Sequence, residues 1–330
     1  MHNVGIIGAG RIAHEHAKAV LALADTQLLA AADISAVTAE AFATTYGCTA
    51  HTDYRELLAR NDLDYVVIAL PHHLHAEVGI ATAKAGKHIF MEKPLALTVD
   101  ECDAIIAAAY QAGVALHVGH HHHFIPANLK LKAMLDSEQF GPVIMATDVW
   151  LKAFFSEPRP PWFLDRACGG GMWLMNGPHL IDRLMFFLNS TVVSVIARVG
   201  SAFHGLSAAD FAQAHLLFAN GTTAQIVHAG YKDGVNRFNL TLTCLEAELK
   251  LTGITEVAIG REDKWTTVPV EAGNCHQAQH SAFIRCLMDG IGAPVTGDWG
   301  REVVRVLLAC EDSSMKGSTR RFESTEIRLD

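Results

Sequence analysis

The stretch Val4-Gly5-Ile6-Ile7-Gly8-Ala9-Gly10-Arg11-Ile12-Ala13 decides the fold of this chain. A short apolar run ends at Gly8, and apolar residues then recur at helical spacing over 12–23. A G-x-G-x-x-A pattern between a strand and a helix is typical of a dinucleotide-binding turn. Gly8 permits the tight turn, Gly10 leaves room for a pyrophosphate, and Ala13 lets the helix pack closely on the strand. We therefore expect a dinucleotide to bind here, with its phosphates at the helix N-terminus.

Asp33 ends the second apolar run, at the place where such folds contact the adenosine ribose. A carboxylate there accepts hydrogen bonds from the ribose hydroxyls and repels a 2′-phosphate. Residues 34–36 are Ile, Ser and Ala, so no arginine follows to bind that phosphate. The sequence thus predicts NAD rather than NADP as the cofactor.

Short apolar runs alternate with helical segments up to about residue 123, which predicts a parallel sheet covered on both faces. After a helix over 127–135, the pattern changes to strand-like runs separated by turn signals, which predicts a mostly antiparallel sheet. We also expect helices at about 179–188, 276–288 and 301–315. The fold class is therefore α/β in the N-terminal part, followed by an α+β part.

Composition excludes several classes of partner. Lys and Arg number 26 against 35 Asp and Glu, a net charge of −9 with no basic block, which argues against nucleic acid and anionic membrane surfaces. No run reaches the roughly 18 apolar residues of a membrane-spanning helix, and no signal peptide is recognisable. The seven scattered cysteines are typical of reduced thiols. We expect a cytoplasmic protein with a small-molecule substrate.

Histidine is unusually frequent, with 19 residues, several of them clustered at 72, 73, 75 and 120–123. If 120–123 is extended, at most two of its rings point the same way. Such a pair with His72, His75 or His179 would supply three imidazoles, as zinc sites do. No cysteine or carboxylate completes an obvious ligand set, so we expect no metal. The rings are expected to bind substrate oxygens or to pack with one nitrogen bonded to backbone.

Four further segments carry chemistry together: Leu70-Pro71-His72-His73-Leu74-His75, Glu92-Lys93-Pro94, Gly119 through Pro126, and Gly169-Gly170-Gly171 through His179 and Asp182. Their order and spacing resemble the Gfo/Idh/MocA oxidoreductases, the family of glucose-fructose oxidoreductase and inositol dehydrogenase. The resemblance spans nearly the whole chain. It implies NAD(P)-dependent hydride transfer at a secondary alcohol, usually of a sugar, a cyclitol or a related ring.

The resemblance also implies a domain organisation. Residues 1–122 would form a Rossmann NAD-binding domain. Residues 123–330 would form an α+β domain for substrate binding, whose large open, mostly antiparallel sheet joins subunits into a homodimer or homotetramer.

Residue roles follow from the same resemblance. Lys93 matches the catalytic lysine, which in the family precedes a cis proline; burial beside a cationic nicotinamide would lower its pKa and suit it to polarise or deprotonate a hydroxyl. His179 matches a histidine that acts as general base. The cofactor site would comprise Gly8, Gly10, Arg11, Ile12, Ala13, Asp33, Leu70, Pro71, His72, His75, Glu92 and Lys93. The substrate site would comprise Lys93, His121, His123, Arg159, Trp162, Arg166, Asn176 and His179.

The sequence departs from the family at the substrate side. Met175 stands four residues before His179, where an Asp or Asn is usual. His72 replaces an asparagine, and histidines fill 120–123 where Asn and Arg are common. Fewer carboxylates and more imidazoles suit an acidic or aromatic substrate better than a plain hexose.

The loop before the glycine triplet adds candidates for such a substrate. Arg159 or Arg166 would fork onto a carboxylate, and Trp162 would stack on a ring; an ordered surface loop is the alternative. Asp182 lies one helical turn after His179 and would orient a neighbouring group or serve as a buried structural acid.

The main hypothesis is an NAD-dependent dehydrogenase of a polyhydroxylated ring: a sugar, a cyclitol or a cis-diol, a carboxylated one included. Two alternatives stay open. One is an enzyme that cleaves glycosides through transient oxidation by tightly held NAD. The other is a non-catalytic NAD-binding sensor, for which the loss of the acid at Met175 would reflect lost catalysis.

Overall fold

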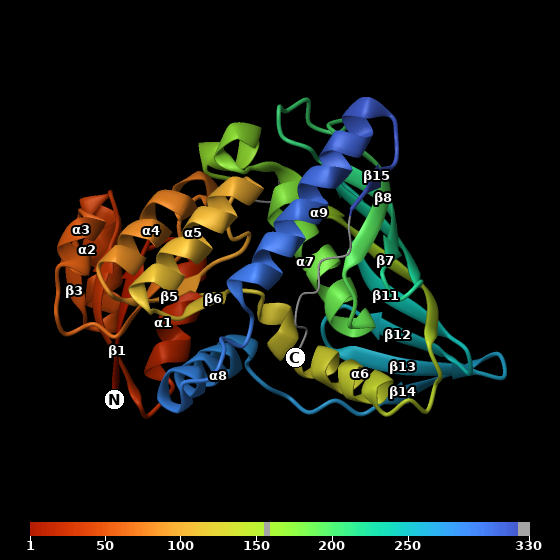
Figure 1. Cartoon of the computed structure of the whole chain (residues 1–330), viewed down its shortest axis with the longest axis horizontal. Coiled ribbons are helices and arrows are strands. Elements are labelled where there is room, and N and C mark those ends of the chain that lie inside the picture. Colours follow the sequence, from red (N-terminus) through yellow and green to blue (C-terminus); the bar gives the residue numbers. More distant parts are fainter. Residues whose placement is uncertain (155–158, 323–330) are drawn as a thin grey trace. The chain divides into compact units, whose positions relative to one another are not determined.

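The computed structural model describes residues 1–154 and 159–322. Contacts divide the chain into two compact units (Figure 1). The first unit comprises Met1–His121 and Asn274–Arg301, and the second comprises His122–Gly273 and the chain from Glu302 onward. Among the described residues, no helix has both the length and the apolar character needed to cross a membrane.

The first unit is built on a six-stranded sheet of order β3-β2-β1-β4-β5-β6, in which every neighbouring pair is parallel. This confirms the predicted parallel sheet. Its elements are β1 (His2–Ile7), α1 (Arg11–Leu21), β2 (Thr26–Ala32), α2 (Ala36–Tyr46), β3 (Thr49–His51), α3 (Tyr54–Leu58), β4 (Tyr65–Ile68), η1 (His72–Leu74), α4 (His75–Lys84), β5 (His88–Met91), α5 (Val99–Ala112), β6 (Leu116–Val118) and α8 (Cys275–Asp289).

Local chemistry sets the ends of these helices. Thr98 and Glu101 form the capping box expected at the start of α5, in which each side chain accepts a hydrogen bond from the other's backbone amide. Gly47 and Gly113 close α2 and α5 in the left-handed conformation, at φ 69° and 66°.

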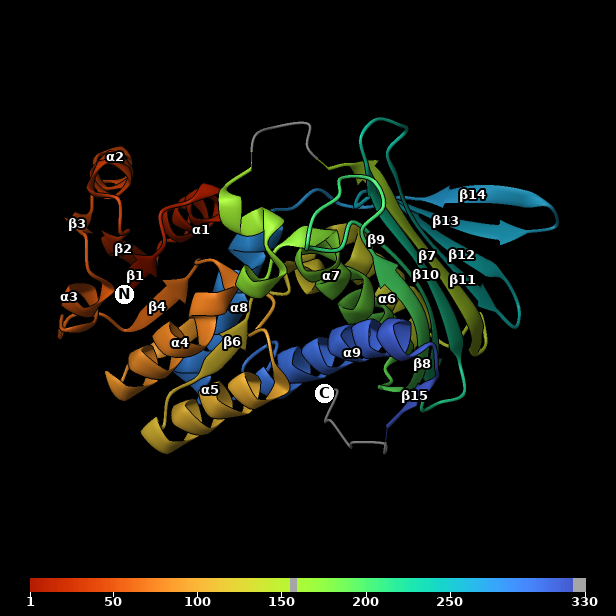
Figure 2. The same cartoon turned by 90° about the horizontal axis from the view of Figure 1, so that it is seen from above.

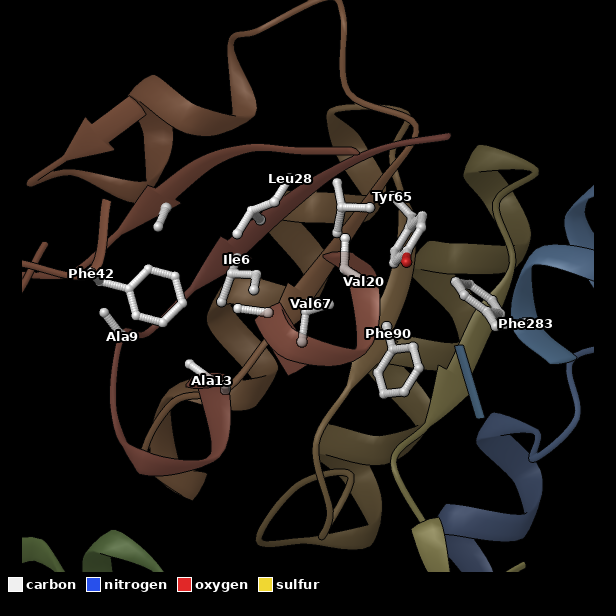
Figure 3. Packing of buried hydrophobic residues seen from close by; sticks show 14 of the residues in the cluster. Ile6, Ala9, Ala13, Val20, Leu28, Phe42, Tyr65, Val67, Phe90 and Phe283 are labelled. Atoms are coloured by element: carbon white, nitrogen blue, oxygen red, sulfur yellow. The ribbon is translucent and has the colours of Figure 1, made fainter. Parts of the chain in front are cut away.

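The core of the first unit lies between α1 and the sheet. Ile6 of β1 and Val67 of β4 are fully buried beneath Ala13 and Val20 of α1 (Figure 3). The small side chain at Ala13 allows the close helix–strand approach that the fingerprint predicts.

Helix α8 packs against this same core, although it comes late in the chain. Phe283 meets Tyr65 edge to face at 5.4 Å and Phe90 at 5.7 Å between ring centroids (Figure 3). The chain therefore returns to the first unit over 274–301, which differs from the contiguous division at 122/123 expected above. The reason is burial, because the apolar face of α8 completes a core formed by residues more than 180 positions earlier.

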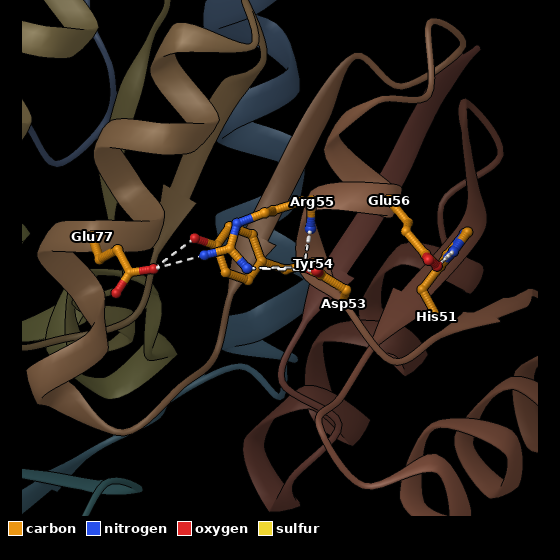
Figure 4. Close-up of polar contacts among 6 residues, drawn as sticks. All are labelled: His51, Asp53, Tyr54, Arg55, Glu56 and Glu77. Atoms are coloured by element: carbon orange, nitrogen blue, oxygen red, sulfur yellow. Dashed lines mark hydrogen bonds and ion pairs between the residues drawn. The ribbon is translucent and has the colours of Figure 1, made fainter.

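The rim of the first unit carries exposed polar contacts between α3 and α4. The hydroxyl of Tyr54 donates to Glu77 at 2.7 Å, and Arg55 lies 3.4 Å from the same carboxylate (Figure 4). Because these groups are solvated, such a pair stabilises the fold by at most about 1 kcal/mol.

The second unit is built on a nine-stranded sheet of order β14-β13-β12-β11-β7-β10-β9-β8-β15, in which β7 and β10 form the one parallel pair recorded. This confirms a large, mostly antiparallel sheet. Its elements are η2 (His121–Phe124, which begins at the unit boundary), α6 (Pro126–Asp136), β7 (Val143–Ala153), η3 (Pro161–Leu164), η4 (Arg166–Cys168), α7 (Gly171–Leu188), β8 (Val192–Gly200), β9 (Phe211–Phe218), β10 (Thr223–Tyr231), β11 (Arg237–Cys244), β12 (Glu248–Thr252), β13 (Glu256–Arg261), β14 (Lys264–Val268) and β15 (Arg320–Arg321); α9 (Gly297–Lys316) begins in the first unit and continues into the second.

Helix α7 covers one face of this sheet (Figure 2). Arg183 of α7 pairs with Asp148 of β7, and both side chains are fully buried. On the opposite face, Met145 of β7, Leu217 of β9 and Ile196 of β8 are 41–50% exposed, and β10 separates β7 from the other two strands. The sheet thus has one covered face and one open, partly apolar face.

Two local expectations for the second unit are wrong. The helix expected from about His179 begins at Gly171 and passes through Pro178. A proline costs one backbone hydrogen bond inside a helix, but this helix is buried on nearly every side, and tertiary packing outweighs that local signal. The segment 121–124 is a turn of 3-10 helix and not extended, so its rings do not alternate.

Candidate active site

The glycine-rich turn follows β1 and touches the loop after β4. Gly8 has φ +91°, and a Cβ on it would lie 2.4 Å from the carbonyl oxygen of Ala69. Only glycine allows both this backbone conformation and this close approach. A Cβ on Gly10 would meet nothing within 4 Å. That open space, above the first turn of a helix that carries no side-chain cap at Gly10, fits a pyrophosphate.

Asp33 is held beside this turn. Its Oδ2 accepts a hydrogen bond from the Ala9 amide at 3.0 Å, and its Oδ1 accepts one from the Ser35 amide at 2.9 Å. The carboxylate is thereby fixed at the carboxyl end of β2, on the same sheet edge as the glycine turn. The residues present fit a dinucleotide, with Arg11 and Ile12 in the first turn of α1.

Lys93 lies in the loop after β5, and the Lys93–Pro94 peptide bond is cis, as the resemblance implies. The side chain is partly buried. Burial lowers the pKa of the Lys93 amine, while the charge of Glu92 acts in the opposite direction. An amine of lowered pKa suits proton transfer near neutral pH.

His75 connects the loop of Lys93 with the loop after β4. Its Nδ1 lies 2.8 Å from the carbonyl oxygen of Pro94, and its Nε2 lies 3.0 Å from that of Leu70. His72 is buried next to it, with ring centroids 5.6 Å apart. The carboxyl ends of β1, β4 and β5 therefore support one continuous set of loops, from Gly8 to Lys93.

The second unit gathers the other predicted group around α7. His179 is 5% exposed and stacks on His122, with centroids 4.4 Å apart and an interplanar angle of 15°. Asp182, one turn further on, accepts a hydrogen bond from Nε2 of His123 at 2.8 Å. The neighbouring group that Asp182 orients is therefore His123, whose ring also lies 4.3 Å from that of Phe186.

Asn176, a further substrate-site candidate, lies on the same helix as His179. Asn176 is buried one turn before it, with Nδ2 3.3 Å from the sulfur of Met172. Met175, at the position where the resemblance implies an acid, is partly buried. His121 belongs to the first unit, where its ring lies 5.0 Å from that of His276.

The loop before the glycine triplet separates its two arginines. The guanidinium of Arg166 makes a bidentate ion pair with Glu311, with nitrogen–oxygen distances of 2.9 and 2.6 Å. It therefore already binds a carboxylate of the protein itself. Arg159 lies 5.3 Å over the ring of Phe163, and Trp162 packs on the same ring at 4.4 Å. Arg159 and Trp162 therefore share one cluster, and Arg166 does not belong to it.

Sequence reasoning missed two residues beside Glu92. Nε2 of His16 lies 2.9 Å from the Glu92 carboxylate, and His280 follows His16 at 2.9 Å. His16 sits on the buried face of α1, where a histidine is unexpected among alanines and valine. That buried position was the one sign in the sequence that His16 has a polar partner. No local pattern could indicate that His280 is a partner, because the two residues lie 264 positions apart.

Comparison with known proteins identifies the family to which both parts of the chain are similar. The family model described as "Oxidoreductase family, NAD-binding Rossmann fold" matches residues 2–120, and the model of the GFO/IDH/MocA C-terminal domain matches residues 128–248.

Three individual proteins illustrate the similarity. The chain is 35% identical to an inositol 2-dehydrogenase of Rhizobium meliloti over 58% of this chain and 57% of that protein. It is 29% identical to a 1-carboxy-3-chloro-3,4-dihydroxycyclohexa-1,5-diene dehydrogenase of Comamonas testosteroni over 69% of this chain and 58% of that protein. The fold matches that of a levoglucosan dehydrogenase solved with NADH, with a TM-score of 0.89 and 21% identity over 98% and 100% of the two chains.

Together the two family models account for well over half of the chain, in the order of its two sheets. The chain therefore belongs to the Gfo/Idh/MocA oxidoreductases, and its first unit carries the NAD-binding Rossmann fold of that family.

Proposed function

We propose that this protein is an NAD-dependent dehydrogenase that oxidises a secondary alcohol of a polyhydroxylated ring. One observation carries the proposal: the glycine turn contacts the loop after β4, and His75 joins that loop to the loop of Lys93. This arrangement supports a proton-transfer role for Lys93, because its loop belongs to the sheet edge at which such folds bind the cofactor. When bound, NAD supplies the acceptor for the hydride that leaves the alcohol carbon.

Lys93 and His179 are the proposed proton-transfer residues. As the alcohol is oxidised, its hydroxyl oxygen releases one proton, and an amine of lowered pKa at Lys93 takes part in removing it. The second proposed residue is His179, a histidine of the second unit. Because Met175 offers no carboxylate, the chain relies on these two residues where relatives would add an acid.

The proposed cofactor is NAD rather than NADP. The support is Asp33, whose carboxylate is fixed by two backbone amides beside the glycine turn. A fixed anion at this place favours ribose hydroxyls over a 2′-phosphate.

The proposed substrates are sugars, cyclitols and cis-diols, carboxylated rings among them. Relatives named inositol 2-dehydrogenase and 1-carboxy-3-chloro-3,4-dihydroxycyclohexa-1,5-diene dehydrogenase support a polyhydroxylated ring. The cluster of Arg159 and Trp162 on Phe163 offers a guanidinium for a carboxylate and an indole for a ring face.

A substrate screen tests the proposal. NAD reduction would be followed over sugars, inositols, aromatic cis-diols and their carboxylated forms, with bound metal assayed in parallel. Reduction of NAD by at least one class is expected. Failure of every class would overturn the proposal and favour the sensor, whereas product release without net NADH would favour the glycoside-cleaving alternative.

We also propose that the open face of the second sheet joins subunits into a homodimer or homotetramer. This face is more apolar than is usual for a solvent-exposed surface, because it carries Met145, Ile196 and Leu217. A Leu217→Glu variant is expected to elute as a smaller species than the unmodified protein in size-exclusion chromatography with light scattering. Unchanged mass would contradict this interface.

A further inference from the structure

Four buried polar side chains from four elements of the first unit form a continuous row that ends at the residue before Lys93. The Tyr65 hydroxyl of β4 lies 3.0 Å from Nδ1 of His280 on α8. Nε2 of His280 lies 2.9 Å from Nδ1 of His16 on α1, and Nε2 of His16 lies 2.9 Å from Oε1 of Glu92. Exposure is 0% for the first three and 6% for Glu92. We call this set the Tyr65–Glu92 row.

Donors and acceptors give the row a single direction when both rings are neutral. A carboxylate only accepts, so Nε2 of His16 carries the proton and donates to Glu92. Nδ1 of a neutral His16 then accepts, so Nε2 of His280 donates to it. Nδ1 of His280 accepts in turn, and Tyr65 donates its hydroxyl proton. Every polar atom named here is satisfied in this arrangement.

At the end of the row away from Glu92, the surroundings of His280 and Tyr65 favour their neutral forms. Phe90 stacks on His280 with centroids 4.6 Å apart and meets His16 edge on at 5.1 Å. Burial lowers the pKa of His280 well below its usual value and raises the pKa of the Tyr65 hydroxyl. The other titratable groups that face the row are Asp25, toward Tyr65, His276 and His117, toward His280, and Lys93, His75 and His121, toward Glu92.

At the near end, Glu92 is held as an anion with both oxygens in use. Burial opposes its ionisation, but the hydrogen bond from His16 and the nearby charges of Lys93 and His121 hold the pKa of the carboxyl below its ordinary range. Oε1 accepts from His16, and Oε2 accepts from the backbone amide of Lys93 at 3.2 Å. The carboxylate is thus fixed between the row and the lysine that follows it.

We infer that the Tyr65–Glu92 row positions an oriented anion beside Lys93, and that this anion keeps the buried amine able to bind a proton during turnover. The inference rests on the role proposed for Lys93 and makes His16, His280 and Tyr65 positioning residues. A buried ammonium without a facing anion is costly. Burial lowers the pKa of Lys93 and Glu92 raises it, so a Glu92 that loses its donor and turns or takes up a proton leaves the amine a weaker base.

The test measures the proton affinity of Lys93 itself. The full chain would be labelled with trace acetic anhydride across a pH series, and mass spectrometry of the Lys93 peptide would report the pKa of its amine. His16→Phe is expected to lower the proton affinity of Lys93 about tenfold, the size of effect typical of a lost neighbouring charge. His280→Phe is expected to act in the same direction with a smaller shift.

Two variants serve as matched comparisons. His16→Gln keeps an N–H for Glu92 and an oxygen for His280, so the pKa of Lys93 is expected to stay near that of the unmodified protein. His117→Phe removes another buried histidine that packs on Phe90 and Phe283, outside the row. It is expected to lower the melting temperature as His280→Phe does, without moving the pKa of Lys93.

An unchanged Lys93 pKa in folded His16→Phe would overturn the inference. Should that variant not fold, Tyr65→Phe and His280→Phe decide, and no shift in either has the same meaning. Labelling needs no substrate, so it separates the two proposals. If Lys93 shifts while no alcohol reduces NAD, the proposed function fails and the row's effect on Lys93 stands.

Discussion

The two groups of site residues are held in different ways. Around the glycine turn and the loop after β4 in the first unit, backbone atoms fix the polar side chains: amides hold Asp33, and two carbonyls flank His75. In the second unit, side chains hold one another, as His179 stacks on His122 and His123 binds Asp182. Backbone contacts follow from the fold and tolerate little change, whereas side-chain pairs are replaced one residue at a time. We therefore expect substitutions to be tolerated more readily among the side-chain pairs around His179 than around the glycine turn.

The largest expected effect tests whether chemistry resides in the first unit. Lys93→Ala should lower the rate of NAD reduction about 10²–10⁴-fold for every substrate, because the proton-transfer group is lost. The binding of NAD, measured by calorimetry, should weaken far less than turnover, because Asp33 and the glycine turn stay intact. The exposed Lys84→Ala is the control. Unimpaired turnover in Lys93→Ala would show that Lys93 does not carry the proton transfer and would remove the distinction between the units.

A second variant asks whether the histidine group joins the chemistry or only binds substrate. His179→Ala should lower kcat about 10²-fold, since an imidazole in proton transfer contributes effects of this order. His123→Asn, which removes the partner of Asp182, should change KM more than kcat. Steady-state kinetics separates the two, and a kcat unaffected by His179→Ala would confine the second unit to binding.

A third variant probes cofactor choice in the first unit alone. Asp33→Ala should weaken NAD binding about tenfold to a hundredfold through loss of charged hydrogen bonds, and it should improve NADP binding by removing the repulsion of a 2′-phosphate. Titration of both cofactors provides the measurement, with the exposed Asp62→Ala as control. Equal NAD affinity in the two variants would show that Asp33 does not contact the ribose.

The pH dependence of alcohol oxidation sharpens the contrast further. Burial lowers the pKa of Lys93, and only the neutral amine accepts a proton. The rate should therefore rise with pH and level off above an apparent pKa that is lower than lysine's ordinary value of about 10.4. Below that apparent pKa the rate should fall about tenfold per pH unit. His179→Ala should leave the apparent pKa in place; its disappearance would assign it to the imidazole instead.

The smallest effect distinguishes the two arginines before the glycine triplet. Arg166→Gln should lower stability by about 1 kcal/mol, because it breaks a partly exposed fork on Glu311, and should leave KM unchanged. Arg159→Gln should raise KM several-fold for carboxylated rings alone. Thermal melting and kinetics report the two effects, and a KM change in Arg166→Gln would return that residue to the substrate site.

Local patterns were sufficient for much of the first unit. The glycine turn, the placement of Asp33 and the capping box at Thr98 depend on residues a few positions apart, so periodicity and spacing predict them. Strand-like runs separated by turn signals likewise predict the mostly antiparallel second sheet. What failed was also local in origin: the helix expected over about 179–188 begins at Gly171 and passes through Pro178, because burial of α7 outweighs the cost of a proline.

The sequence by itself determined the cofactor fold, the family and the candidate proton-transfer residues, because each is encoded in a short motif whose geometry the backbone dictates. Only the tertiary structure decided the partners of those residues. It returned α8 to the first unit and so placed His280 against His16, stacked His179 on His122, and engaged Arg166 with Glu311. Such contacts join residues tens to hundreds of positions apart, and burial of apolar surface, which local spacing does not encode, selects them.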